Sequence, residues 1–260
     1  MLSFYYTEKV ALYVKNKNPI MKTLKEIQET KYVNYINSTI IDDIYIIPGL
    51  NGKEINLDKS FSNMHEINTY NEEYLVFNDI KPKVSLEDNK DKIIIKGNKE
   101  KQSISLIFEN YNSLSKYLLS KGLKVNILLS DKNYDNNYEL INNSNNTMYY
   151  EIEDYLNKNK LNKNLCYIKE DNNIPNNCKN KYLFKPSLII SHSNISTTIN
   201  NISSGDILLI KDTISLTELE IILNQISYRN LDIIPLSKLI LLISTSLLLS
   251  ANIEATFDNE

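Results

Sequence analysis

Acidic, amide and basic side chains follow two apolar runs at which buried strands are expected to end. Glu109 and Asn110 come directly after the run Ile104 to Phe108, and Lys211 and Asp212 come directly after a second apolar run. Residues that leave the carboxyl ends of strands in one α/β domain converge on a common mouth. Two carboxylates there could hold water, a cation or sugar hydroxyls, with the lysine neutralising one of them. The alternative is that these are ordinary solvated residues at strand ends.

The segment Lys101 to Asp131 predicts the framework that positions the first pair. The apolar run before Glu109 suits a strand buried on both faces. Ser113 can cap a helix whose apolar residues recur at helical spacing, and Gly122 then supplies a left-handed stop. Val125 to Leu129 is the next apolar run. A strand, a helix and a strand this close together predict a right-handed parallel crossover, with chemistry at the carboxyl ends of its strands.

Several stretches carry a family resemblance. Ile107 to Asn112 stands where a Phe-Asp-Asp-Gly-Pro signature ends the first strand of that family, and Gly122 to Leu128 stands where it has Gly-(Val/Ile)-Lys-Ala-Thr-Phe-Phe. Ile207 to Asp212 and Asp232 to Leu239 are similar to its Leu-Leu-His-Asp strand end and its closing strand. These stretches resemble the polysaccharide deacetylase family, also called the NodB-homology or carbohydrate esterase family 4 domain. The chain resembles a degenerate member of this family, of the Firmicutes type. The resemblance covers Lys101 to about Leu242.

The resemblance implies a specific hydrolytic chemistry. Family enzymes remove N-acetyl or O-acetyl groups with a divalent metal that one Asp and two His hold, together with an Asp base and a His acid. Asn110 stands at the metal-ligand Asp position and is a neutral, poorer ligand, while Glu109 keeps the carboxylate of the base. Asn142 to Thr147, where the His pair should fall, contains no histidine. Lys211 replaces the general-acid His, whereas Asp212 persists.

The remaining parts of that chemistry are also missing. The whole chain has only two histidines, His65 and His192, which are too far apart in sequence to form a local pair. The segment Cys166 to Asp171, which corresponds to an Arg-Pro-Pro segment of the family, has no arginine. We therefore expect no bound metal and no cofactor. The degenerate equivalents of the catalytic residues are Glu109, Lys211 and Asp212.

Composition excludes other classes of function. The chain has 260 residues, 42% of them hydrophobic, which is enough for a substantial core. Its 29 basic and 32 acidic residues nearly cancel, which argues against an electrostatic nucleic-acid binder. There is no phosphate-binding glycine loop, no zinc-binding cysteine cluster and no nucleophile elbow. The two cysteines, Cys166 and Cys178, fit either one disulfide in an exported domain or two reduced, packed thiols.

Other stretches, some before the resemblance and some within it, predict further elements. Apolar spacing predicts a short helix after Pro19, and Thr39 to Ile47 and Ile93 to Ile95 have the composition of strands. Lys132 to Thr147 is expected to be a loop. Glu151 to Leu161 is expected to be a helix, and Ile240 to Ala251 a packed helix rather than a membrane segment. We expect the division 1–32 N-terminal helix, 33–98 β-rich extension, 99–245 deacetylase-like domain and 246–260 C-terminal tail.

The prediction is an α/β fold, a distorted or incomplete (β/α) barrel of the NodB type with a small β-rich N-terminal extension. The leading hypothesis for function is a catalytically degenerate deacetylase-like protein that retains glycan binding. The alternatives are an active carbohydrate deacetylase with a site rebuilt around Glu109, Lys211 and Asp212, and a structural or partner-binding module. The resemblance favours the extracellular face of the cell membrane over the cytoplasm, with cell-wall glycan as the partner. The first residues resemble the juxtamembrane part of anchored relatives, which implies membrane proximity through a missing anchor.

Overall fold

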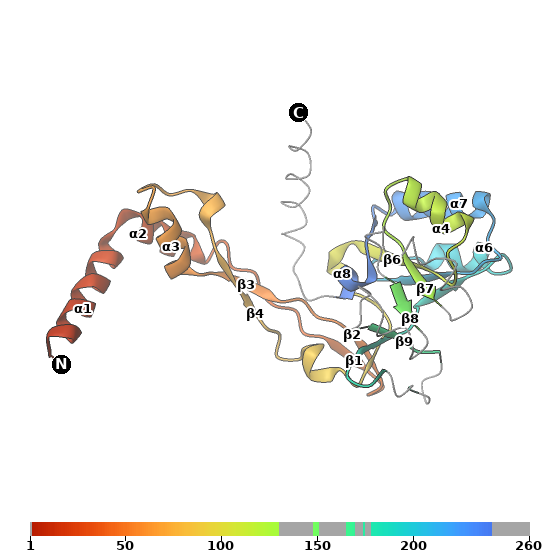
Figure 1. Ribbon diagram of the computed structural model, residues 1–260, viewed down its shortest axis with the longest axis horizontal. Coiled ribbons are helices and arrows are strands. Elements are labelled where there is room, and N and C mark those ends of the chain that lie inside the picture. The colour runs from red at the N-terminus through yellow and green to blue at the C-terminus, as the bar shows by residue number, and fades with distance from the viewer. Residues whose placement is uncertain (1, 130–147, 151–164, 170–173, 175–177, 241–260) are drawn as a thin grey trace. The chain divides into compact units, whose positions relative to one another are not determined.

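The computed structural model describes residues 2–129, 148–150, 165–169, 174 and 178–240 (Figure 1). The chain divides into two compact units, each built from separate stretches. The first unit comprises Met1–Ile36 and Asn51–Pro82, and the second comprises Asn37–Leu50 and Lys83–Glu260. This division differs from the expected boundaries, because strands from the stretch 33–98 pair with strands far later in the chain.

The first unit is mainly helical. It contains α1 (Leu2–Lys17), α2 (Pro19–Gln28) and α3 (Leu57–His65), with β3 (Gly52–Ile55) paired antiparallel to β4 (Phe77–Ile80). The predicted helix after Pro19 is confirmed as α2. Asn18 caps it by accepting a hydrogen bond from the amide of Ile20, and the proline takes the first helical position. A small core holds the unit together, formed by Ile20, Leu24, Ile55 and Met64.

A parallel sheet in the second unit positions the polar strand ends. Its order is β11, β12, β6, β7, β8, and each neighbouring pair is parallel. The predicted parallel pairing of the strands on either side of the first crossover helix is confirmed, since Phe108 of β6 pairs with Ile127 of β7. The strands are β6 (Ser103–Phe108), β7 (Asn126–Leu129), β8 (Met148–Tyr150), β11 (Leu188–Ile190) and β12 (Ile207–Ile210).

The carboxyl half of β6 pairs with β7, whereas its first residues pair with β13 (Asp232–Ile233). The strand that the family resemblance implies from Asp232 onward ends there. Leu236–Ile240 instead form a short helix, α8. Pro235 explains this ending, because its ring nitrogen cannot donate a ladder hydrogen bond, while its carbonyl accepts from the amides of Lys238 and Leu239.

A second sheet of this unit has the order β1, β2, β5, β10, β9. Its strands are β1 (Thr39–Ile41), β2 (Tyr45–Ile47), β5 (Ile93–Ile94), β9 (Leu165–Tyr167) and β10 (Tyr182–Phe184). The alternating stretch from Thr39 to Ile47 is thus a hairpin of two strands, because Asp42 and Asp43 turn the chain with positive φ angles of 50° and 56°. The described strands form these separate sheets and do not close into one barrel.

Helices cover one face of the parallel sheet (Figure 1). They are α4 (Ser113–Ser120), α6 (Ile195–Thr198) and α7 (Leu216–Tyr228), and a 3-10 turn at Ile199–Asn201 directly follows α6. Other 3-10 turns lie at Glu72–Tyr74, Glu87–Asn89 and Lys99–Lys101. All six residues of β6 are buried, as expected for a strand covered on both faces. Leu106 and Phe108 pack toward α4 and α7, whereas Ile107 faces a second core that includes Phe184 and Leu239.

The helix ends test two sequence signals. Gly122 ends α4 with a φ of 74°, as predicted, and Ser215 and Glu218 form a capping box at the start of α7. The predicted cap of α4 is corrected by one residue. The side chain of Asn112, not Ser113, accepts hydrogen bonds from the amides of Leu114 and Ser115.

Two further features bear on the expectations from sequence. Cys166 and Cys178 form a disulfide, with Cα atoms 5.6 Å apart. In the described ranges we find no helix with the length and apolar character needed to span a bilayer. Three expectations lie outside the described residues, namely the loop at Lys132 to Thr147, the helix at Glu151 to Leu161 and all but the first residue of the helix at Ile240 to Ala251.

Candidate functional site

Three adjacent parallel strands end at one edge of the sheet. Ile190 of β11 pairs with Ile210 of β12, and Ile210 pairs with Phe108 of β6. The residues that follow each strand therefore leave the same edge. We call the group formed by Glu109, Asn110, Asn112, Lys211 and Asp212 the polar edge.

An ion pair crosses this edge between the two central strands. The Nζ atom of Lys211 donates a hydrogen bond to Oε1 of Glu109, and both side chains are 34% exposed. The backbone of Lys211 is fixed as well, because its amide donates to the carbonyl of Ile190 at 2.9 Å. The positive charge of Lys211, which stands where the resemblance implies the general acid, is thus paired with the carboxylate of Glu109, which stands where it implies the base.

Asp212 is held by two amide side chains from the other strand end. Its carboxylate oxygens accept hydrogen bonds from the Nδ2 atoms of Asn110, at 2.5 Å, and Asn112, at 2.7 Å. The Oδ1 atom of Asn112 simultaneously caps α4 by accepting from the amides of Leu114 and Ser115. One amide side chain therefore connects the start of α4 to the end of β12.

The two histidines belong to different units. His65 belongs to α3 of the first unit, where its ring centroid lies 5.2 Å from that of Phe61. His192 follows β11 in the second unit, and its Nδ1 atom lies 2.7 Å from Oε1 of Glu218. Hydrogen bonds from the amide and hydroxyl of Ser215, with a smaller contribution from His192, hold the pKa of Glu218 below its usual value.

The residues of the polar edge do not fit the divalent metal that the family chemistry requires. Both carboxylate oxygens of Asp212 accept from amide groups, and Asn110 offers a neutral side chain that already donates to Asp212. In the ranges that the structure describes, no three His, Cys, Asp or Glu side chains gather as a metal-binding group. Asn142 to Thr147, the expected place of the His pair, lies outside those ranges and contains no histidine.

Sequence reasoning named Glu109, Asn110, Lys211 and Asp212, and the structure brings these four residues to one edge of the sheet. A role for them toward a ligand stays a prediction. Sequence reasoning missed Asn112, which links two elements of the site. Its signal was available, because an Asn three residues before Ser115 has the spacing of a helix cap.

No protein-family model matches the chain. In its fold the chain is similar to proteins of carbohydrate esterase family 4, so the resemblance predicted from sequence is confirmed at the level of the fold. One of these similar proteins is BA3943 of Bacillus anthracis, a pseudoenzyme of that family. Its wild-type crystal structure has a TM-score of 0.56 at 15% identity, covering 86% of this chain and 95% of that one.

A BA3943 mutant with restored enzymatic activity has a TM-score of 0.58 at 14% identity, covering 86% of this chain and 98% of the mutant. Among curated proteins, the uncharacterised protein YlxY of Bacillus subtilis is 29% identical over 93 residues. That match spans 35% of this chain and 29% of YlxY.

Proposed function

We propose that the second unit is a catalytically inactive relative of the carbohydrate esterase family 4 deacetylases that works by binding glycan at the cell envelope. The observation that carries the proposal is the histidine content of the chain. Metal-dependent deacetylation in this family needs two metal-binding histidines and a third as acid, and the entire chain has two histidines in different units.

The polar edge supports the same conclusion. Its groups are joined to one another, Glu109 with Lys211 and Asp212 with Asn110 and Asn112. Side chains held in this way are poor metal ligands, but carboxylate and amide groups can exchange such hydrogen bonds for those of sugar hydroxyls. The likeness to a pseudoenzyme gives a precedent for a member of this fold that lost activity.

The disulfide supports the location. Cys166 and Cys178 are both buried, and disulfides of this kind persist in oxidising compartments rather than in the cytoplasm. We therefore place the protein outside the cytoplasm, with cell-wall glycan as its partner. We also propose that the two sheets of the second unit are parts of the incomplete barrel expected for the family.

A glycan-binding measurement tests this proposal. Purified protein is incubated with insoluble peptidoglycan and with chitin, and the bound fraction is measured after sedimentation. We expect the parent to sediment with glycan and the double variant Glu109→Gln, Asp212→Asn to lose most of that binding. The control is Glu100→Gln, Asp232→Asn, which removes the same charge near the amino ends of β6 and β13.

Equal binding by the parent and the Glu109→Gln, Asp212→Asn variant would show that the polar edge does not bind the glycan. No binding by any form would favour a structural or partner-binding module instead. A site rebuilt around Glu109, Lys211 and Asp212 would reveal itself as acetate release that this double variant lacks.

A further inference from the structure

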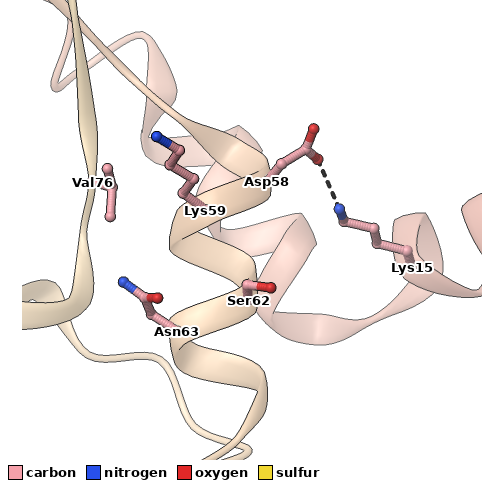
Figure 2. A pocket seen from close by; sticks show the side chains of 6 residues that line it. All are labelled: Lys15, Asp58, Lys59, Ser62, Asn63 and Val76. Carbon is pink, nitrogen blue, oxygen red and sulfur yellow. Dashed lines mark hydrogen bonds and ion pairs between the residues drawn. The ribbon is translucent and has the colours of Figure 1, made fainter.

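A polar groove lies in the first unit, apart from the residues that the proposed function uses. It has a volume of about 530 Å³, within the range of ligand sites. Helices α1 and α3 and the residue that precedes β4 form it (Figure 2). The residues that line it are Lys15, Asp58, Lys59, Ser62, Asn63 and Val76.

One wall of the groove is rigid. The amide of Val76 donates a hydrogen bond to Oγ of Ser60 at 2.9 Å, and its carbonyl accepts from the amide of Asn56 at 2.8 Å. Ser60 and Met64 are buried against the core of the unit, so α3 must present its opposite, polar face to the groove. The groove is thus built on packed elements rather than on loops.

The lining has an excess of hydrogen-bond donors. Its single carboxylate, on Asp58, is already paired with the ammonium group of Lys15 at 2.7 Å. Within the described residues, the ammonium group of Lys59 makes no ion pair. Figure 2 shows Lys59 and Asn63 on the side of α3 that faces Val76, away from the Lys15–Asp58 pair. One positive charge, an amide and the hydroxyl of Ser62 therefore remain to bind a ligand.

We propose that this groove binds an anionic, hydroxyl-rich chain, such as a polyol or saccharide that carries phosphate or carboxylate groups. A negative group would accept charge-assisted hydrogen bonds from Lys59 and Asn63, and neighbouring hydroxyls would reach Ser62. Val76 supplies an apolar surface for the carbon skeleton. A neutral glycan has no negative group to pair with the ammonium group of Lys59.

Calorimetric titration of the full chain tests the proposal with three soluble probes. Tetragalacturonate carries carboxylates, a glycerol phosphate oligomer carries phosphates, and chitotetraose is neutral. We expect at least one anionic probe to bind and the neutral probe not to bind at this groove. The stronger of the two anionic probes identifies the source of the charge.

Matched variants show whether the groove itself is responsible. Lys59→Gln should weaken binding of the anionic probe about tenfold, the effect of one charge-assisted hydrogen bond. Lys22→Gln removes the same charge from an exposed position on α2 outside the groove and should change the affinity less than about twofold. Asp58→Asn releases Lys15 and should tighten binding severalfold.

Equal losses in Lys59→Gln and Lys22→Gln would overturn the proposal in favour of diffuse charge attraction. The absence of binding by both anionic probes would overturn it as well. The Glu109→Gln, Asp212→Asn variant should keep full affinity for the anionic probe, which separates this groove from the polar edge of the second unit.

Discussion

The ammonium group of Lys101 lies almost entirely out of water at the start of β6. The residue is 5% exposed, and its Nζ atom donates a hydrogen bond to the carbonyl of Lys238 at 2.6 Å. Burial lowers the pKa of Lys101 to about 8, because the charged form of the side chain loses hydration in the interior.

This burial predicts a pH-dependent stability. Between pH 8 and the ordinary lysine pKa of 10.5, the unfolded chain keeps a proton that the folded chain has lost. The free energy of unfolding therefore rises with pH in this window, by up to about 3 kcal/mol. Urea unfolding of the parent and of Lys101→Met at several pH values measures it. The stability difference between the two should shift toward the parent as pH rises, and parallel pH profiles would contradict the prediction.

The ion pair between Glu109 and Lys211 should contribute little to stability. Both side chains are about one third exposed, and exposed pairs of this kind typically contribute about 0.2–1 kcal/mol. A double-mutant cycle with Glu109→Gln and Lys211→Met measures the coupling by chemical denaturation. We expect a coupling free energy below about 1 kcal/mol. A coupling near 3 kcal/mol would show that the pair is an essential part of the fold.

The sequence allowed the polar edge to be located, with the lysine expected to neutralise one carboxylate, but it did not predict the hydrogen bonds that hold Asp212. Glu109 and Lys211 could be placed because each follows a recognisable apolar run and the carboxyl ends of parallel strands share one edge. The hydrogen bonds of Asp212 to Asn110 and Asn112 depend on side-chain orientations across strands far apart in sequence. Local patterns carry no information about such orientations.

Two glycines with positive φ show how differently one residue type acts in two elements. Gly122, with φ 74°, ends α4 and has open space where a Cβ atom would stand. Gly205, with φ 88°, precedes β12, and a Cβ atom there would overlap the carbonyl oxygen of Gly97. The Gly97 amide also donates to the Gly205 carbonyl at 2.7 Å, so these two backbone segments cannot separate freely.

Alanine substitutions should separate the two effects. Gly122→Ala should lower the free energy of unfolding by about 1 kcal/mol, the strain of a left-handed alanine. Gly205→Ala carries the same strain and a steric overlap with backbone, so its loss should exceed that of Gly122→Ala by about 2 kcal/mol or more. Thermal and urea unfolding of both variants provide the comparison. Equal losses would show that the Gly97 segment moves aside without cost.

At the scale of elements, local signals sufficed where a pattern and its end signals coincided. The apolar run of β6 and the stop at Gly122 are of this kind. The second sheet was not foreseen, because β5 pairs in parallel with β10, whose sequence lies far along the chain. The helix α8 was also missed, since hydrophobic residues near Leu239 fit a short strand and a short helix equally.

For the second unit as a whole, we expect the disulfide to contribute substantially to the free energy of unfolding. Cys166 lies in β9, and Cys178 lies 12 positions later, shortly before the neighbouring parallel strand β10. Closing a loop of this length restricts the unfolded chain and contributes roughly 3 kcal/mol. Urea unfolding with and without reductant, and of Cys166→Ala, Cys178→Ala, should show a loss of that order. Unchanged stability on reduction would contradict the predicted contribution.

The central claim is that this chain has the fold of a deacetylase without its activity. An assay for the hydrolysis of acetyl groups tests this claim most directly. The full chain is incubated with acetylated chitooligosaccharides and with peptidoglycan, with zinc or cobalt added, and released acetate is measured. We predict no release above the blank, and no gain from Asn110→Asp, because one restored carboxylate cannot replace the missing histidines. Acetate release by the parent that the Glu109→Gln, Asp212→Asn variant lacks would contradict the account.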